Sequence, residues 1–575
     1  MARMAKTREP RTRPTRRPAG AAGPVAEHDP DDAPRRPDRA PGVIVVLVLL
    51  VLIASATVRL YELQRPPVFV FDEVYYAKDA HAILQGALAG TAAYPWEPGK
   101  EISWPHPEYG KYAIALGEAA FGYHSFGWRI VAAIVGTLLL CLIYPIGRRL
   151  GLPPVWALLG LVLAASDFLG IVQSRIATLD IFVAFWSVLC VYLALRYVQS
   201  GHRTRWLVLC GLAGGLALGT KWSGAFAIAA AAAYILLHRH RPADAWRRWP
   251  WLAAGVAVVV AGGAFTALGV PAPGLLPHVS LAVALAAAGV VTLEVGVPDV
   301  RLPSLALAAL PAGLYFASYV DYFALGHHTL SQWWQLQQEM WWFNETLHAT
   351  HTYASRAYTW IFDYRPVWYY YEQIGGRVHG IISIGNPLLW WGSIAALVGL
   401  VVLAVRRRDR ELAVLPITVA LLYLPWLRTT RTSFMYYMTP VAPFMALAVA
   451  ALLHELAASR LPRWQIAAAC YAAACVVAAL LWYQIGVAAD WLFWRDPAAL
   501  STDLARVTLA VGITIAVLVI LGLFFWAPAK RLWPYLTWIY AGAVTGVCLA
   551  FLPILIDLPI SIPHFYHLMW FRNWI

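Results

Sequence analysis

Charged residues are scarce in this sequence. Only 13% of its 575 residues are Asp, Glu, Lys or Arg, whereas 60% are hydrophobic and the mean hydropathy is +0.59. Soluble globular chains carry about twice that share of charge. The composition therefore excludes a soluble enzyme and predicts an integral membrane protein.

Cysteine is also rare, and alternating apolar patterns are missing. All six cysteines lie inside apolar stretches, with no closely spaced pair in a polar loop. The sequence therefore predicts neither a disulfide framework nor a metal site. An outer-membrane barrel is excluded, because the apolar runs are continuous whereas barrel strands alternate with a period of two.

Long apolar runs are abundant, and 28 Trp suit the boundary between lipid and water. About fifteen runs are long enough to span, or nearly span, a bilayer core. The two between 251 and 296 are interrupted by prolines, so we expect an all-α polytopic protein with about 11 to 15 transmembrane helices. The runs lie near 43–60, 126–146, 153–172, 179–197, 205–220, 223–238, 251–270, 278–296, 303–323, 387–405, 411–427, 437–458, 464–485, 504–527 and 533–557.

The placement of basic residues predicts the orientation in the membrane. Residues 1–42 hold ten Lys/Arg and six Asp/Glu in a Pro-rich stretch, which predicts a disordered cytoplasmic tail. With this tail inside, the short Arg-rich loops also fall inside. The long polar loops 61–125 and 324–386 then lie outside. The first belongs to an N-terminal membrane module (43–323), and the second joins this module to C-terminal transmembrane helices (387–575). The net charge of +13 thus reflects membrane topology, and we expect no nucleic-acid partner.

Both long loops contain candidate amphipathic helices. In the second loop, Trp333, Leu336, Met340, Phe343 and Leu347 recur at spacings of three and four residues. Gln, Glu and Asn interrupt this segment, so we expect it to lie in the outer interface rather than span the membrane. The first loop offers a shorter candidate from residue 75 to 88.

An acidic pair, Asp72 and Glu73, follows the first apolar run. Adjacent carboxylates suit a general base and a helper that orients a substrate or a metal. Acidic residues are also favoured at helix N-termini, where they cap free N–H groups. On local grounds both interpretations stay open.

Basic residues at the predicted outer helix ends break the charge bias of the rest of the chain. Arg175, Lys221, Arg428 and Arg431 are the clearest cases, and Arg129 lies near the outer end of the second run. A single Arg can reach the outer headgroups along its own stem. Several cations on one face instead favour a shared anionic ligand.

Several ordered motifs resemble the protein O-mannosyltransferases of actinobacteria. These enzymes are relatives of the eukaryotic members of glycosyltransferase family 39, which have the GT-C membrane fold. The resemblance runs from about residue 43 to the C-terminal Trp, with residues 43–323 as the GT-C catalytic membrane module. The motifs are FDEVYYAKDA, HPEYGK, QSRIATLD, GLALGTKWSG, THTYASRAYTW, YRPVWYYYE and IGNPLLWWG.

The resemblance implies a GT-C glycosyltransferase that transfers mannose, with inversion, from polyprenyl-phosphate-mannose to Ser or Thr hydroxyls of secreted proteins. The reaction is expected at the outer face of the plasma membrane, and a protein-export channel is a further expected partner. Asp72 and Glu73 match the family's catalytic acidic pair. The resemblance assigns the donor phosphate to Arg129, Lys221, Arg175 and Arg431, and acceptor or sugar contacts to His106 and Lys111.

A lipid phosphate is already a good leaving group, so stabilising its charge suffices without a cofactor or metal. No cofactor is expected, although the acidic pair leaves a divalent metal open. The first loop reads His106-Pro107-Glu108-Tyr109-Gly110-Lys111, where the family commonly has His-Pro-Pro-Leu-Gly-Lys. The second loop is too short for the β-trefoil MIR domain of the eukaryotic enzymes, so acceptor recognition is expected from the membrane-domain loops.

Two alternatives remain. A GT-C enzyme with the same type of donor and a lipid or polysaccharide acceptor would carry a similar acidic pair and similar cations. A transporter or lipid-flipping protein would instead show inverted repeats and charges within broken helices. The sequence shows no internal repeat, and its unusual charges lie at helix ends.

Overall fold

The computed structural model describes residues 41–89, 105–239, 303, 305–347, 349–429, 431–457, 471 and 532–575. Residues 1–40 of the predicted tail lie outside the described residues, as do the predicted runs near 251–270, 278–296 and 504–527. Of the run near 464–485, only Tyr471 is described.

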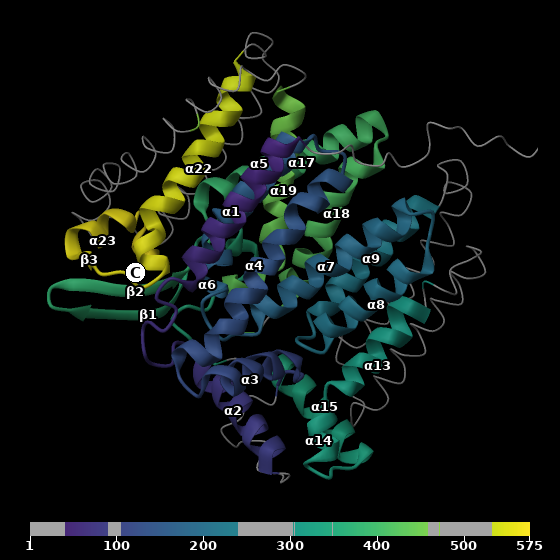
Figure 1. The fold of residues 1–575 in the computed structure, drawn as a ribbon, viewed down its shortest axis with the longest axis vertical. Coiled ribbons are helices and arrows are strands. Elements are labelled where there is room, and N and C mark those ends of the chain that lie inside the picture. Colours follow the sequence, from purple (N-terminus) through teal and green to yellow (C-terminus); the bar gives the residue numbers. More distant parts are fainter. Residues whose placement is uncertain are drawn as a thin grey trace, which may run out of the picture. The chain divides into compact units, whose positions relative to one another are not determined.

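Helices dominate the described residues, as the apolar runs predict, and the fold is that of a polytopic α-helical membrane protein (Figure 1). Among the described residues, six helical segments are long and apolar enough to cross a membrane. They are α1 (Gly42–Leu60), α4 (Ser125–Arg149), α7 (Asp180–Gln199), α17 (Pro387–Arg407), α18 (Arg410–Tyr423) with the 3-10 helix η3 (Leu424–Arg428), and α22 (Trp533–Leu555).

Shorter helices complete the bundle. The apolar ones are α5 (Pro154–Ala165), α8 (Thr204–Leu218), α9 (Gly224–Arg239), α13 (Leu310–Ala317), which follows the π-helix η2 (Leu305–Ala309), and α19 (Ala442–Ala457). The remaining short elements are α6 (Phe168–Gln173), α14 (Val320–Ala324), η4 (Met435–Met438), α23 (Ile562–Leu568) and η7 (Arg572–Trp574).

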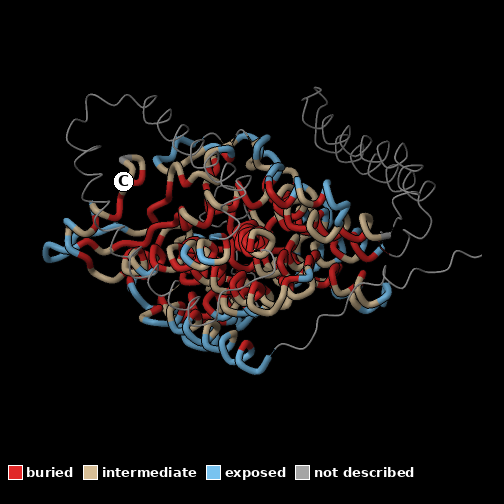
Figure 2. Tube along the Cα trace, turned by 90° about the horizontal axis from the view of Figure 1, so that it is seen from above, coloured by how far each residue is buried: buried red, intermediate tan, exposed pale blue. Residues whose placement is uncertain are grey.

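Helix α19 belongs to the centre of the core. Its sequence is apolar on every side, and all residues from Ala442 to Leu453 are buried. A helix that is apolar all round needs neighbours on every face, and α19 packs against α5, α17, α18 and α22. Figure 2 shows the buried segments gathered in the middle of the molecule and the exposed ones at its rim.

The two polar loops carry helices at the same end of the bundle (Figure 1). The first loop contains α2 (Glu73–Ala89) and α3 (Tyr109–Phe121), and the second contains α15 (Leu330–Thr346) and α16 (Ala357–Trp360). Thr329 and Gln332 cap α15 reciprocally, which fixes its start. Ile83 of α2 packs with Leu336 and Met340 of α15, so the predicted amphipathic helices pair through their apolar faces.

The second polar loop also forms a β-hairpin, which the sequence did not predict. Strands β1 (Val367–Ile374) and β2 (Arg377–Ser383) pair antiparallel, and β3 (Ile560–Ser561) adds to β2 in the order β1-β2-β3. Gly375 and Gly376, at φ of 58° and 75°, form the turn, a backbone conformation that favours glycine. The chain end closes on this sheet, because Trp368 Nε1 donates to the Trp574 carbonyl at 2.7 Å.

Candidate active site

Glu73 begins α2 and is fully buried, with both carboxylate oxygens occupied. Its Oε1 accepts hydrogen bonds from Arg129 Nε at 2.8 Å and from the Ala177 amide at 2.9 Å. Its Oε2 accepts from Arg129 Nη2 at 2.8 Å and from the Val70 amide at 3.0 Å. A carboxylate that already accepts four hydrogen bonds has little capacity left for a substrate proton. The geometry therefore gives Glu73 a positioning role.

Arg129 is buried beneath the first polar loop, with no exposed surface. Besides Glu73, its guanidinium binds a ring of backbone oxygens, so all of its N–H donors have acceptors within the protein. This geometry argues against the predicted phosphate role, because a phosphate would have to displace these partners. The oxygens are those of Leu63, Arg65, Pro66 and Val68, at 2.9–3.2 Å.

Asp72 precedes Glu73 but faces a different environment. It is partly exposed, and its Oδ2 accepts one long hydrogen bond from the Tyr436 hydroxyl at 3.5 Å. Burial raises the pKa of Asp72 to about 7; the charge of Lys221 opposes this rise and that of Asp180 adds to it. A general base works best when its pKa lies near the working pH. Asp72 therefore combines partial exposure with a pKa that suits a general base.

Lys221 lies at the start of the turn before α9, beside Asp72. Its Nζ forms an ion pair with Asp180 Oδ1 at 2.9 Å and lies 4.4 Å from the centre of the Tyr437 ring. It is also 5.9 Å from the ring of Tyr436, whose hydroxyl binds Asp72. The ammonium has three donors and can therefore bind an anion while keeping Asp180.

Arg431 approaches the same tyrosine from the second half of the chain. Its Nη2 donates to the Tyr437 hydroxyl at 3.2 Å, and its Nη1 donates to Asn344 Oδ1 of α15 at 2.5 Å. The guanidinium carbon lies 5.8 Å from the ring centre. Tyr437 therefore brings together two cations, Lys221 and Arg431, from segments about 210 residues apart, as the shared-anion hypothesis requires.

Arg175 holds the end of α1 instead of joining this pair. It is 4% exposed, and its Nη1 donates to the carbonyls of Val58, Arg59 and Tyr61 at 2.7–3.0 Å. These are among the last carbonyls of a helix, which lack partners within the helix and attract cations. The geometry argues against its predicted phosphate role and favours a C-terminal cap.

Lys111 and His106 lie in the first polar loop but differ in their access. Lys111 is fully buried and forms ion pairs with Asp79 at 3.1 Å and Glu108 at 3.0 Å, so it is held within the loop. Glu108, which departs from the family pattern, is thus a partner of Lys111. His106 is partly exposed, and burial together with the positive charges of Lys221, Arg431 and Lys111 lowers its pKa well below the usual value. His106 is therefore neutral near pH 7 and faces the cation pair.

An aromatic cluster, which the sequence did not reveal, lies beside Asp72 and contacts it through the Tyr436 hydroxyl. Phe71 packs on Tyr369 of β1 at 4.7 Å between ring centres, and on Tyr436 at 5.7 Å. Phe434 stacks on Tyr436 at 5.3 Å, and His351 meets Phe434 edge-on at 4.9 Å. The run FMYYM beside Arg431 was the available signal. We call Phe71, His351, Tyr369, Phe434 and Tyr436 the aromatic cluster.

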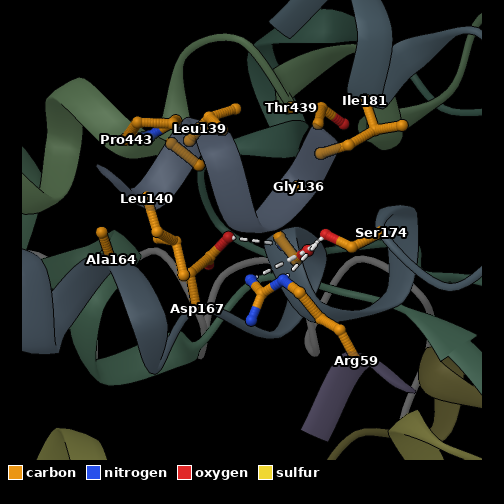
Figure 3. Close-up of a pocket in the computed structure, with 12 residues that line it drawn as sticks. Arg59, Gly136, Leu139, Leu140, Ala164, Asp167, Ser174, Ile181, Thr439 and Pro443 are labelled. Carbon is orange, nitrogen blue, oxygen red and sulfur yellow. Dashed lines mark hydrogen bonds between the residues drawn. The ribbon is translucent and has the colours of Figure 1, made fainter. Parts of the chain in front are cut away.

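A separate cavity of about 20 Å³, lined mostly by apolar atoms, lies inside the helix bundle (Figure 3) and is large enough for about one water. Arg59 and Asp167 line it, and Arg59 Nε donates to Ser174 Oγ at 3.1 Å. Asp72 and Lys221 are not among its lining residues, so it is distinct from the candidate site. In the part of the chain that the structure describes, no group of three or more His, Cys, Asp or Glu side chains could hold a metal ion.

Two family models match this chain. The model of dolichyl-phosphate-mannose-protein mannosyltransferase matches residues 48–272, and that of the C-terminal four-transmembrane region of protein O-mannosyltransferase matches residues 329–574. The polyprenol-phosphate-mannose–protein mannosyltransferase of Mycobacterium tuberculosis is 26% identical over 497 residues, which cover 76% of this chain and 84% of that protein. The corresponding protein of Corynebacterium glutamicum is 26% identical over 444 residues, covering 67% and 77%.

The fold resembles a solved structure from Saccharomyces cerevisiae, that of the protein O-mannosyltransferase Pmt1-Pmt2 complex bound to the sugar donor. The TM-score is 0.58 at 13% identity, and the match covers 94% of this chain and 93% of that chain. The similarity extends over nearly the whole length of both chains.

Proposed function

The chain belongs to the protein O-mannosyltransferase family, and we propose that it transfers mannose from polyprenyl-phosphate-mannose to Ser or Thr hydroxyls of proteins. The names of its relatives support this donor and a protein acceptor. The observation that carries the proposal is the position of Asp72. It is a partly exposed carboxylate with a pKa near 7, set beside the cation pair Lys221 and Arg431.

The proposed reaction is a single displacement at the anomeric carbon. The Asp72 carboxylate takes the proton of the acceptor hydroxyl, and the hydroxyl oxygen forms a bond to C1 of mannose. The bond between C1 and the phosphate oxygen breaks on the opposite face, so the anomeric configuration inverts. The electron pair leaves with the polyprenyl phosphate, whose charge Lys221 and Arg431 stabilise.

Glu73, Arg129 and Arg175 have positioning roles in this mechanism. Arg129 and Glu73 bind both sides of the chain turn that presents Asp72. Arg175 ties the end of α1 to the segment that precedes α7. His106 is neutral and is proposed to contact the sugar or the acceptor.

The reaction is proposed to take place at the outer face of the plasma membrane, where secreted chains emerge from an export channel. The basic residues of the short loops support this orientation. Cysteines placed at Gln335 on α15 and at Arg406 near the end of α17, both exposed positions, test it. In intact cells an impermeant maleimide should label Gln335→Cys but not Arg406→Cys, above the wild-type background. The reverse pattern would contradict the orientation.

The direct test uses purified protein, synthetic polyprenyl-phosphate-mannose and a peptide with one Thr. The expected product is mannosyl-Thr whose anomeric configuration, measured by NMR, is opposite to that of the donor. Retained configuration would exclude the single displacement. Donor consumption with a lipid or glycan acceptor, but not with peptide, would move the assignment to the other acceptor class.

A further inference from the structure

Strand β1 has one unpaired edge. In the order β1-β2-β3, β1 pairs only with β2, and in the described ranges none of its backbone groups takes part in another backbone hydrogen bond. Its first three residues are buried, whereas Glu372 to Ile374 are exposed. Figure 1 shows the hairpin with β1 on the side away from α22 and α23. Proteins usually blunt such edges with charge, and here Glu372 is the strand's only charged residue.

The buried end of β1 leads to the candidate catalytic carboxylate. Tyr369 belongs to the aromatic cluster, with its ring 4.7 Å from that of Phe71 and 6.0 Å from that of Tyr436. The Tyr436 hydroxyl in turn binds Asp72. A chain that follows the edge of β1 inward therefore arrives at Asp72.

We propose that the acceptor polypeptide binds as an extra strand on the free edge of β1, which guides its hydroxyl to Asp72. This inference rests on the proposed protein acceptor. An unpaired strand edge offers alternating N–H and C=O groups, which an extended polypeptide satisfies and a lipid tail does not. Recognition through the backbone also tolerates varied side chains, as suits an enzyme without an appended recognition domain in its second polar loop.

The length of the free edge of β1 determines how many acceptor residues can bind along it. Tyr370 to Ile374 span about 17 Å at about 3.4 Å per residue. We therefore expect about five residues on one side of the modified Thr to contribute to binding, while the other side contributes less. Peptides shortened on the binding side should show a raised KM for peptide with little change in kcat.

The test is a scan of N-methylated peptides with the full-length enzyme. The parent peptide carries one Thr flanked by six residues on each side, and each variant carries one N-methyl group in place of one backbone N–H. Successive residues of a strand point their N–H groups to opposite sides. The expected result is a KM that rises about tenfold at every second position on one flank, with kcat within about twofold of the parent.

Each other outcome of the scan counts against the inference. If the parent peptide is mannosylated but N-methylation has no alternating effect, the inference is overturned and the proposed function stands. If the parent peptide receives no mannose while a lipid or glycan does, both fail together.

Two proline variants of the enzyme provide a matched pair. Tyr371→Pro and Glu372→Pro remove adjacent N–H groups of β1, one directed to β2 and one to the free edge. The variant that loses the N–H directed to the free edge should raise the KM for peptide about tenfold at an unchanged melting temperature. The variant that loses the N–H directed to β2 should lower the melting temperature. If the edge variant only separates a dimer and leaves KM unchanged, a second copy occupies the edge and the inference is wrong.

Discussion

Neighbouring carboxylates in this chain have opposite environments. Glu73 accepts four hydrogen bonds in the core, whereas Asp72 accepts one from Tyr436 and is partly exposed. The two residues stand on either side of the start of α2, with Asp72 in the preceding turn and Glu73 as the first helical residue. One residue of the acidic pair can therefore position the loop while the other reaches the substrate.

The pKa of Asp72 predicts the pH dependence of the reaction. Only the carboxylate form accepts a proton, so kcat/KM should rise about tenfold per pH unit up to about pH 7 and then level off. Lys221→Met should move the midpoint to higher pH, because the Lys221 charge lowers this pKa. Initial rates at a saturating donor concentration and a low peptide concentration, measured across this pH range, give kcat/KM for the peptide. A flat profile between pH 5 and 8 would contradict Asp72 as the base.

The same pKa has a consequence for stability. Folding raises the pKa of Asp72 from 3.8 to about 7, so the folded protein binds this proton more tightly than the unfolded chain. The stabilising contribution is full below about pH 4 and is lost as the pH rises toward 7. Asp72→Asn should remove this loss, which makes the variant at least as stable as the wild type at pH 8 by thermal unfolding.

Arg431 offers a matched comparison with Arg428 of η3. Arg431 contacts Tyr437 and Asn344, whereas Arg428 is exposed. Arg431→Ala should weaken donor use by about 10- to 100-fold in kcat/KM, in line with the loss of one charge-assisted phosphate contact worth about 1.5–3 kcal/mol. Arg428→Ala should stay within about twofold. An equal loss of kcat/KM in both variants would indicate that Arg431 acts only through its long-range charge.

At the scale of elements, the end of α1 depends on a side chain from the segment before α7. Arg175 binds the carbonyls of Val58, Arg59 and Tyr61, which α1 cannot satisfy internally. Arg175→Ala should lower the free energy of unfolding by about 1.5–3 kcal/mol, as expected for the loss of hydrogen bonds to a charged group. In the remaining folded protein the KM for donor should stay within about threefold, measured beside thermal unfolding in the same detergent. A large donor KM effect at normal stability would restore its phosphate role.

The helices were predictable because membrane spans follow from composition alone. The runs near 43–60, 126–146 and 387–405 became α1, α4 and α17 within a few residues at each end. The hairpin was not predictable in the same way. Its strand β1 carries the aromatic run Trp368–Tyr371, which also suits a membrane interface, and its pairing with β2 and β3 depends on distant segments.

The sequence indicated which residues to consider for the candidate site but not which of them lie together. Cations at helix ends predict an anion site, yet the sequence could not separate Lys221 and Arg431 from Arg129 and Arg175. The difference lies in the backbone oxygens that a folded turn directs at a guanidinium. Such oxygens exist at every residue, so only the tertiary structure reveals which of them converge.

At the scale of the whole molecule, the chain end closes the sheet that borders the site. Trp574 is buried, its Nε1 donates to the Asp363 carbonyl at 2.7 Å, and its own carbonyl accepts from Trp368. Trp574→Ala should cost about 3–5 kcal/mol of stability. We expect it to lower the melting temperature and increase proteolysis within the hairpin. Unchanged protection of the hairpin would show that the sheet holds without the chain end.

We infer that Asp72 is the base and Glu73 a positioning residue, and one measurement separates these roles. Mannose transfer to peptide and thermal unfolding are measured together for Asp72→Asn and Glu73→Gln. We expect Asp72→Asn to lose about 10²- to 10⁴-fold in rate without losing stability. Glu73→Gln should be markedly less stable, while its folded fraction keeps transferring mannose. A stable Glu73→Gln without transfer, beside an active Asp72→Asn, would contradict this inference.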